Sequence, residues 1–380
     1  MSDRFVLSAE FDPVIARYLR QQAPVERNRA QGGKLPDLWS GLVHEVGVVG
    51  LLVPEHLGGQ GAGPLELGSA LREAGRQGWS GPLAATAGVA VALLAAVDPD
   101  DDSGLRSAIA QGRVVVPALT QDRRGESLET TVRYADGRIR GHRTFVDSGT
   151  HAAEFLLPVR AGDETALAVV ERATAGVAVR PQEAVDPGRG LATLDLADVP
   201  ARVLARGPQV DSAVEEAWRL GALLVAADAV GATERAFELA LAYADTRRQF
   251  GRPIGGFQVV KHKLVEMYAE LELARSALRE ALRMADARLP GWPGAAAAAK
   301  SVVGDGSTHV LREAIQVHGG IGFTWEHELT HHFRRVMACR ALYGTPAAHR
   351  RSVAAERGLV SDVPACVAPR AAGPRTRVTR

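Results

Sequence analysis

The fold is decided by two stretches of the sequence, Arg247-Arg248-Gln249-Phe250-Gly251-Arg252-Pro253-Ile254 and Gln316-Val317-His318-Gly319-Gly320-Ile321-Gly322-Phe323-Thr324-Trp325-Glu326-His327-Glu328. A pair of glycines lets the backbone approach a ligand that any side chain would block, and an arginine near an aromatic residue suits a pyrophosphate and a planar ring. Each stretch alone is a weak signal, because a glycine pair near a helix end is more often a cap. Together, in this order and spacing, they predict a dinucleotide site built from two distant segments.

The composition restricts the class of protein. The chain has 380 residues, enough for two or three domains, and a formal net charge of +1 without a basic cluster, which argues against a nucleic-acid partner. Its two cysteines, Cys339 and Cys366, cannot build a disulfide framework, and no N-terminal apolar run resembles a signal peptide, so we expect a reduced, cytoplasmic setting. The apolar run 84–97 is too short to span a bilayer and predicts a buried helix. The sequence shows no metal-ligand spacing.

Three zones predict the order helix, sheet, helix. Residues 10–112 carry helical apolar spacings, residues 113–207 carry short apolar runs bounded by Asp-Gly and Gly-Asp turns, and the pattern is helical again from about 211. A stripe of apolar residues from Leu264 to Leu282 recurs at three- and four-residue steps, as core packing requires. We therefore expect an α+β protein with domains at 1–112, 113–207 and 208–358, the last a four-helix bundle, and a disordered tail at 359–380.

These motifs resemble the acyl-CoA dehydrogenases, flavoenzymes that bind FAD and desaturate thioesters between Cα and Cβ. Besides the two quoted stretches, the resemblance rests on Leu38-Trp39, on Gly50-Leu51-Leu52-Val53-Pro54-Glu55 and on Gly141-His142-Arg143-Thr144-Phe145-Val146, and it ends near residue 358. It implies the fold of that family, with an N-terminal helical domain, a middle β-barrel-like domain and a C-terminal four-helix bundle.

The resemblance also implies which residues hold FAD. The nucleotide contacts of the family fall on Arg247, Phe250 and Gln258, with a second group at Gln316, Gly319 and Gly320. Nearer the flavin ring, the expected contacts are Thr120, Phe145 and Val146, and Thr345 is a further one. The ring side departs from the family, because Leu119–Ser127 lacks the usual Pro and Gly-Ser-Asp turn, and Asp147 stands where Ser or Thr is common. The altered loop disfavours ordinary straight-chain acyl substrates.

The catalytic base is the larger departure. Desaturation needs a positioned carboxylate to remove an α-proton while hydride leaves Cβ for the flavin. Most of the family places a Glu directly before Gly-Thr, where this chain has Tyr343, and a branch places it early in the helix before Arg-x-x-Phe-Gly, where an ungapped count gives Gly221. Because an unperturbed tyrosine has a pKa near 10, Tyr343 is a poor base and is expected to fill the vacated space instead. The sequence leaves the catalytic residue unassigned.

Three functional hypotheses follow. The one we favour is an FAD-dependent subunit of a mixed oligomer, resembling actinobacterial acyl-CoA dehydrogenases that act on steroid side chains, in which a partner subunit supplies the catalytic Glu. The second is a self-sufficient flavoenzyme of secondary metabolism with an unusual acyl substrate, and the third is a non-catalytic acyl- or flavin-binding relative. The expected partners are an acyl-CoA or carrier-protein thioester, an electron-transfer acceptor, and further subunits in a homo- or hetero-oligomeric dimer or tetramer.

Overall fold

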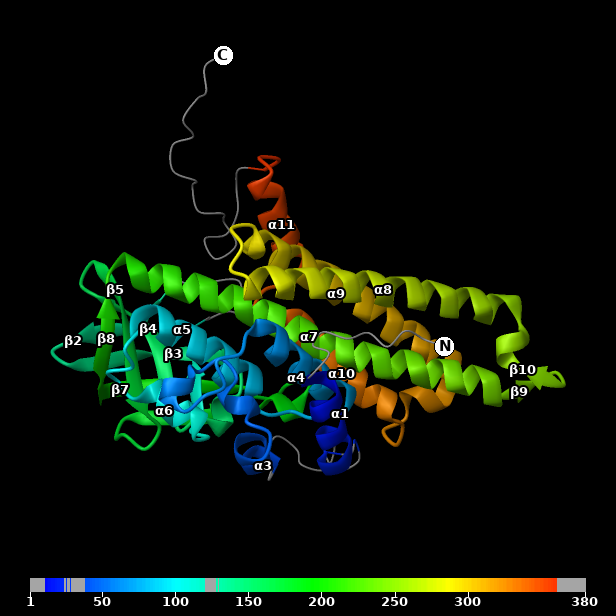
Figure 1. Cartoon of the computed structure of the whole chain (residues 1–380), viewed down its shortest axis with the longest axis horizontal. Helices are drawn as coiled ribbons and strands as arrows, with labels where there is room; N and C mark the ends of the chain where they lie inside the picture. The colour runs from blue at the N-terminus through cyan, green and yellow to red at the C-terminus, as the bar shows by residue number, and fades with distance from the viewer. Residues whose placement is uncertain are drawn as a thin grey trace, which may run out of the picture.

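The computed structural model describes residues 11–23, 25, 28, 38–119, 128 and 130–360. Thr120 and the tail from 361 onward lie outside the described residues. The chain begins with helices, as predicted (Figure 1). These are α1 (Phe11–Gln22), α3 (Leu38–His44), α4 (Pro64–Arg76), the π-helix η3 (Ala84–Ala90), α5 (Val91–Val97) and α6 (Leu105–Ala110), with 3-10 turns η1 (Val48–Gly50) and η2 (Glu55–Leu57). The run predicted as a buried helix is η3 continued by α5, and every η3 residue is buried.

In the described part of the chain, a mixed sheet of eight strands follows the helices. The strands are β1 (Val115–Pro117), β2 (Arg133–Ala135), β3 (Arg138–Val146), β4 (Glu154–Ala161), β5 (Glu164–Glu171), β6 (Val177–Pro181), β7 (Ala192–Pro200) and β8 (Arg202–Arg206). They pair in the order β6-β7-β3-β2-β4-β5-β8, and β1 pairs in parallel with β4. The β3–β7 register shifts between Arg143 and Val146. Such irregularities re-aim side chains, and this one lies where β3 reaches the pocket described below.

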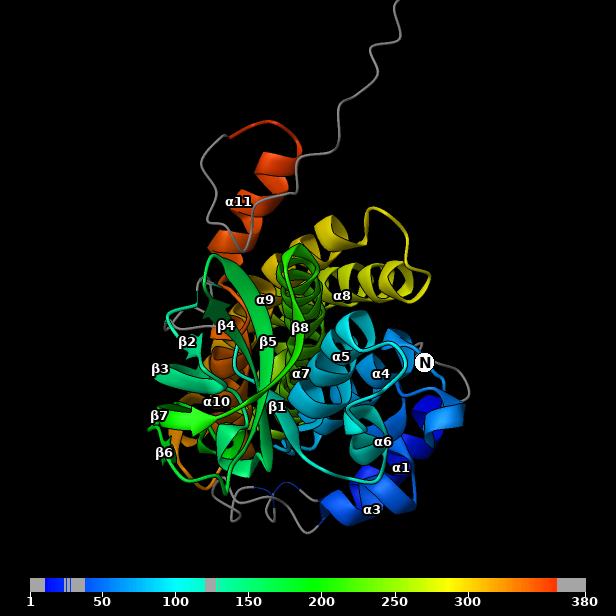
Figure 2. The same cartoon turned by 90° about the vertical axis from the view of Figure 1, so that its left-hand side faces the viewer.

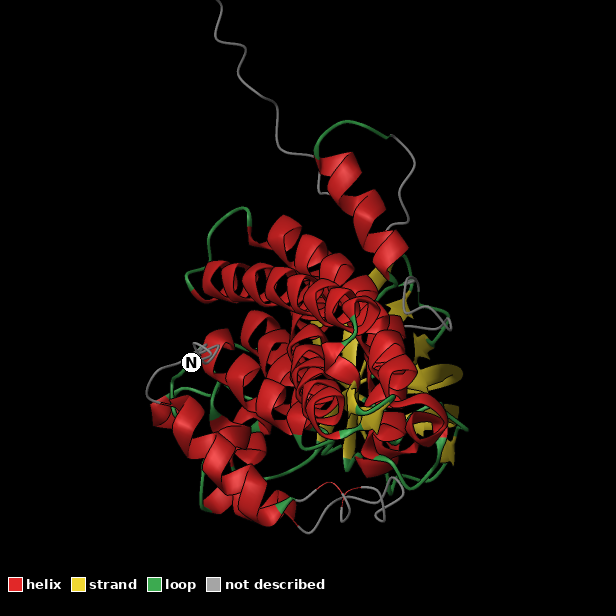
Figure 3. Cartoon of the chain, turned by 90° about the vertical axis from the view of Figure 1, so that its right-hand side faces the viewer, coloured by secondary structure: helices red, strands yellow, loops and turns green. Residues whose placement is uncertain are grey.

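The C-terminal helices pack on one another and against the sheet. They are α7 (Pro208–Thr246), α8 (Gln258–Asp286), α9 (Trp292–His318), α10 (Glu328–Ala341) and α11 (Pro346–Glu356), and the short strands β9 (Arg248–Gln249) and β10 (Arg252–Pro253) lie between α7 and α8. Figures 2 and 3 show the sheet at one end of the molecule and the helices filling the other. The predicted stripe on α8 is buried at Met267, Leu271, Leu278 and Leu282. Within the described part of the chain, no helix is both long and apolar enough to cross a membrane.

Two glycines allow α4 and α7 to touch backbone to backbone. A Cβ added at Gly231 would lie 1.8 Å from the carbonyl oxygen of Arg72, and one added at Gly75 would lie 2.0 Å from the carbonyl oxygen of Asp228. No real Cβ occupies such positions, so the two helices are closer than any side chain permits. This contact fixes how the N-terminal helices sit on α7.

Buried ion pairs join the same helices. Arg72 of α4 lies 3.3 Å from Asp12 of α1, 2.6 Å from its neighbour Glu73 and 3.5 Å from Glu234 of α7. All four side chains are buried. Removing one partner from such a group leaves a buried charge without compensation, which is strongly destabilising.

We expect Gly231→Ala to lower the free energy of unfolding by about 1–3 kcal/mol, because the added methyl group meets backbone that can move only if α4 and α7 separate. Thermal denaturation measures the effect. The matched control is Gly320→Ala, where an added Cβ has no neighbour within 4 Å and the melting temperature should not change. Equal melting temperatures for the two variants would contradict the close helix contact.

Candidate functional site

The predicted site residues gather at two separate places. Phe145, Val146 and Tyr343 line a pocket beside the end of β3 and the segment after α10. The nucleotide-side residues lie instead around β9, β10 and the 3-10 helix η7 (Gly319–Phe323), at the far end of α7 from the sheet (Figure 1). There the ring of Tyr243 near the end of α7 stacks on His318 at the end of α9, with centroids 4.4 Å apart. The fold thus brings the two quoted stretches together.

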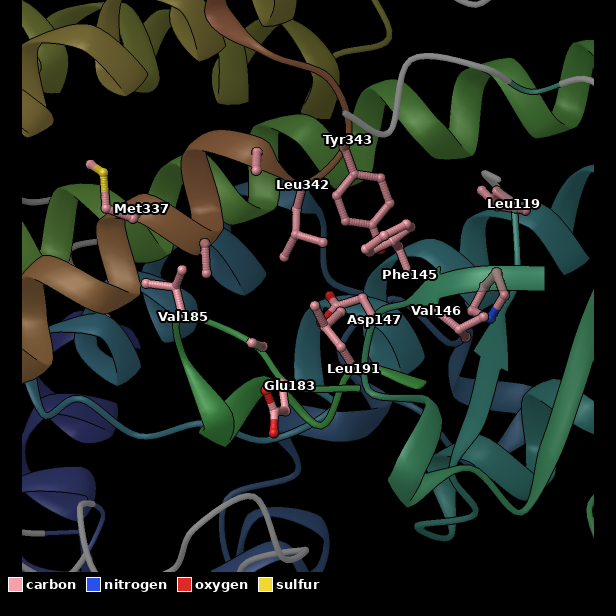
Figure 4. Close-up of a pocket in the computed structure, with 14 residues that line it drawn as sticks. Leu119, Phe145, Val146, Asp147, Glu183, Val185, Leu191, Met337, Leu342 and Tyr343 are labelled. Atoms are coloured by element: carbon pink, nitrogen blue, oxygen red, sulfur yellow. The ribbon is translucent and has the colours of Figure 1, made fainter. Parts of the chain in front are cut away.

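The pocket is largely apolar and has a volume of about 230 Å³. Typical ligand sites measure about 300–1,000 Å³, so this one is small. Figure 4 shows Tyr343 and Leu342 on one side and Leu191 and Glu183 on the other, with Asp147 between them. The remaining lining residues are Pro117, Leu119, Phe145, Val146, Ala184, Val185, Met337, Ala338 and Ala341.

Both walls of the pocket carry unusual backbone. Phe145 and Tyr343 have φ angles of +55° and +54°, the left-handed region that residues with a side chain rarely adopt. Side chains hold both segments, because the Phe145 N–H donates to Gln182 Oε1 (2.9 Å) and His349 Nε2 lies 2.8 Å from the Tyr343 carbonyl oxygen. Strain of this kind persists only where the surroundings over-determine it, and it concentrates at functional sites.

The two positions at which the sequence resemblance predicts a catalytic Glu, 221 and 343, face each other in space. A Cβ added at Gly221 would lie 2.6–2.9 Å from the Cε1, Cδ1 and Cζ atoms of Tyr343, so the tyrosine ring covers the glycine. Tyr343 is buried, and burial raises the pKa of its hydroxyl above the ordinary value of 10. A phenol in this environment does not accept protons near neutral pH. The ring therefore occupies the space between the two positions, and neither of them carries a carboxylate.

A buried group of charged residues lies behind the pocket. Arg189 Nη2 is 2.8 Å from Asp228 Oδ2, and Arg335 Nη1 is 3.2 Å from Asp186 Oδ2. Arg335 Nε also lies 3.6 Å from Asp228 Oδ1, which links the two pairs. The sequence patterns did not indicate this group. The available signal was Asp228 itself, an isolated charge within the apolar stretch 222–230 of a long helix.

Two further reactive side chains belong to the same buried region but have structural roles. Arg189 Nη2 lies 2.8 Å from Cys339 Sγ, and Lys300 donates a hydrogen bond to the Cys339 carbonyl oxygen. Burial raises the pKa of the Cys339 thiol to about 11 and lowers the pKa of Lys300 to about 7. Because the thiolate is the reactive form, Cys339 is not a nucleophile here.

At the far end of α7, the nucleotide-side residues are open to solvent. Arg247 is exposed and the Phe250 ring is 93% exposed. Gly319 adopts a φ of +64° at the end of α9 and so also acts as a helix cap. Gly320 has no positive φ, and an added Cβ there would meet nothing within 4 Å. The packing of this chain therefore does not explain why residue 320 is a glycine, whereas close approach of a ligand would.

Three other expected contacts have different surroundings. Gln258 is the first residue of α8 and is exposed, and Gln316 in the last turn of α9 is also exposed. Thr345 is the N-cap of α11, where its hydroxyl accepts a hydrogen bond from the Ala348 N–H (3.3 Å). A structural reason for Thr345 thus exists without any ligand.

Comparisons with known proteins show the family of this chain. The model of the acyl-CoA dehydrogenase N-terminal domain matches residues 10–97, and the model of the C-terminal domain matches residues 212–357. The acyl-CoA dehydrogenase FadE27 of Mycobacterium tuberculosis is 31% identical over 78% of this chain and 81% of its own length. The chain belongs to the acyl-CoA dehydrogenase family. It is therefore a flavin oxidoreductase, and its cofactor is FAD.

Other relatives of this acyl-CoA dehydrogenase match along nearly their whole length. The acyl-CoA dehydrogenase IpdE2 of Mycobacterium tuberculosis is 29% identical over 90% of this chain and 94% of its own. A variant of the Tcur3481-Tcur3483 steroid ACAD superimposes with a TM-score of 0.83 at 26% identity, covering 92% of this chain and 98% of the other. The ChsE4-ChsE5 complex from Mycobacterium tuberculosis has the same fold, with a TM-score of 0.83 at 24% identity and coverage of 95% and 99%.

We expect Gly221→Ala to destabilise the enzyme by about 1–3 kcal/mol, because the new methyl group overlaps the Tyr343 ring. The second substitution Tyr343→Leu should relieve part of this loss, since a flexible aliphatic side chain can move aside. A double-mutant cycle by chemical denaturation measures the coupling between the two positions. Strictly additive effects would show that the two side chains do not meet.

Proposed function

We propose that this chain is a subunit of an FAD-dependent acyl-CoA dehydrogenase that desaturates an acyl thioester between Cα and Cβ, and that a partner subunit supplies the catalytic Glu. The observation that carries the proposal is the contact between Tyr343 and Gly221. The Tyr343 ring fills the space between the two positions at which the family places its base, and neither position carries a carboxylate. Removal of an α-proton requires a positioned group of suitable pKa, and in this proposal a Glu of the partner subunit provides it.

The separation between the two groups of site residues supports the oligomer. Gly221, beside the pocket, and Arg247, at the nucleotide end, lie 26 residues apart along α7, which at 1.5 Å per residue is about 39 Å. One FAD is too short to contact both ends. The exposed residues at the nucleotide end therefore fit an FAD whose flavin ring lies in a neighbouring subunit.

Two-component relatives favour a partner that differs from this chain. The ChsE4-ChsE5 complex pairs two different chains, and the Tcur3481-Tcur3483 steroid ACAD also names two components. In such an arrangement one chain can lose its base while it keeps its contribution to the cofactor site. We extend this division of labour to the present chain, with a steroid-like or otherwise bulky acyl group as the substrate class.

Each group of residues has a distinct task in this proposal. Arg247 binds the pyrophosphate, Phe250 covers the adenine, and the open backbone at Gly320 lets the dinucleotide approach closely. FAD held by these residues would supply the acceptor for the hydride that leaves Cβ. The apolar pocket residues exclude water from the reacting end of their ligand. The thioester is an acyl-CoA or a carrier-protein conjugate, and an electron-transfer acceptor reoxidises the flavin. We retain the prediction of a cytoplasmic setting.

Arg247→Ala should weaken FAD binding by about tenfold or more, because a charge-assisted contact contributes about 1.5–3 kcal/mol. The neighbouring residue Arg248 is also exposed, and Arg248→Ala provides the matched control for loss of one positive charge. Isothermal titration of the deflavinated oligomer with FAD measures both affinities. Unchanged flavin affinity in a folded Arg247→Ala oligomer would remove this residue from the cofactor site.

The chain purified alone and loaded with FAD should show little acyl-CoA dehydrogenation, since the missing base contributes on the order of 10²–10⁴ in rate. Co-expression with a dehydrogenase-like partner chain should restore turnover. Tyr343→Phe tests the hydroxyl directly and should leave the activity of the complex unchanged. If the isolated wild-type chain is fully active and Tyr343→Phe abolishes that activity, the tyrosine is catalytic and the partner-supplied base is wrong.

A further inference from the structure

One carboxyl group in the pocket has no task in the proposed function. Asp147 follows β3, lines the pocket and is only 6% exposed. Among the described residues, neither of its carboxyl oxygens has a hydrogen-bond partner. Figure 4 places the side chain in the middle of the pocket, between Leu342 and Leu191. Buried polar groups in native proteins are nearly always satisfied, so an exception of this kind requires an explanation.

The buried charges behind the pocket balance without Asp147. Arg335 pairs with Asp186 at 3.2 Å and Arg189 pairs with Asp228 at 2.8 Å, which matches two cations to two carboxylates. The nearest contact of Asp147 to a cation is 3.9 Å, from Oδ2 to Arg189 Nη1, which is beyond hydrogen-bond distance. Within the described part of the chain, an ionised Asp147 would therefore be a third carboxylate facing two arginines.

A proton on Asp147 resolves this imbalance. An ionised carboxylate buried without hydrogen bonds is far more costly than the neutral acid, and such groups normally take up a proton instead. Burial is the main cause that raises the pKa of Asp147, the two arginines oppose it, and Asp228 and Asp186 add to it. Two other titratable groups line the pocket: the Tyr343 hydroxyl, which is uncharged, and Glu183, whose side chain is exposed to solvent.

We propose that Asp147 is a neutral carboxylic acid in the wall of the pocket and that its O–H donates a hydrogen bond to an acceptor atom of the bound molecule. This inference rests on the proposed function in taking that molecule to be the flavin ring or the acyl thioester, both of which carry carbonyl acceptors. Apolar sites can keep a carboxylic acid neutral at pH 7 so that it serves as a donor. A protonated acid cannot be the base, so Asp147 and a partner-supplied Glu have different roles.

Protonation is tested first, in the FAD-loaded complex with its partner chain. The infrared spectrum at pH 7 should contain a protonated carboxyl C=O band that disappears in Asp147→Asn and persists in Glu183→Gln. Glu183 is the matched control because it lines the same pocket but is exposed. A spectrum in which Asp147→Asn removes no such band would overturn the proposal.

Stability provides a second, independent measurement of the same proton. The raised pKa of Asp147 means that the folded state binds this proton more tightly than the unfolded state does. The contribution of the proton to the free energy of unfolding is therefore fully present below about pH 3.9, and it is lost as the pH rises through the folded-state pKa. The Asn side chain in Asp147→Asn does not ionise, so this variant does not lose stability at this position as the pH rises. Its melting temperature should equal or exceed that of the wild type, and the difference should grow with pH. Asp228→Asn, which takes a carboxylate from its arginine pair, should instead lower the melting temperature. If Asp147→Asn is as destabilising as Asp228→Asn, Asp147 is an anion and the proposal is wrong.

Binding measurements decide whether the acceptor atom belongs to the flavin or to the acyl thioester. Asp147→Ala removes the donor, whereas Asp147→Asn keeps an N–H donor in its place. A donor to the flavin predicts that Ala, but not Asn, shifts the visible absorption bands and weakens FAD binding about 2–10-fold. A donor to the thioester predicts unchanged FAD binding and a similar loss of affinity for an acyl-CoA that cannot be oxidised.

If neither affinity nor spectrum changes in Asp147→Ala, the O–H has no ligand acceptor and the proposal fails. These outcomes are separate from the proposed function, which is tested by whether the wild-type complex binds FAD and whether an acyl thioester reduces it. A wild-type complex that fails there would refute the enzyme assignment, while the infrared and stability measurements would still decide the charge of Asp147.

Discussion

The arrangement of this enzyme depends on one 39-residue helix, α7, that joins the pocket end of the molecule to the nucleotide end. The helix carries Gly221 beside Tyr343, Gly231 against the backbone of α4, and Arg247 at its C-terminal end. A helix has a fixed rise per residue, so these three places cannot be moved relative to one another without breaking backbone hydrogen bonds. This geometry separates the pocket from the residues predicted to bind the nucleotide, and in the function proposed above a second subunit therefore completes the cofactor site.

Buried charge rather than apolar packing alone positions the pocket walls. Asp228 of α7 pairs with Arg189, which follows the sheet strand β6, and lies 3.6 Å from Arg335 of α10. The group thereby ties the sheet, α7 and α10 together directly behind the pocket. Breaking a buried pair costs about 3–5 kcal/mol, because the remaining charge has no solvent to stabilise it. Asp147 lies at the edge of this group, where both arginines already have a carboxylate partner. Its charge state therefore decides whether it can donate a hydrogen bond to a ligand in the pocket.

Much of the fold could be predicted because local sequence patterns determine its helices and strands. The apolar stripe of α8 recurs at helical spacing and is buried at Leu271 and Leu278 as expected, and the short apolar runs of the middle zone became strands. The order helix, sheet, helix needs nothing more than these periodicities. The buried group around Asp228 could not be predicted in the same way, because the residues that pair within it lie 39 to 149 positions apart and meet only when three elements pack together.

The motifs around Arg247 and Gly320 point to the family, and through it to FAD, by their resemblance to acyl-CoA dehydrogenases, and the comparisons with known proteins confirm that family. The sequence also shows that neither base position holds a carboxylate. It cannot show that Tyr343 and Gly221 touch, because 122 residues of chain separate them and only helix packing closes that distance. Nor can it assign a proton to Asp147. That depends on burial and on which arginines the neighbouring aspartates have already paired with, and both arise only when the chain is folded.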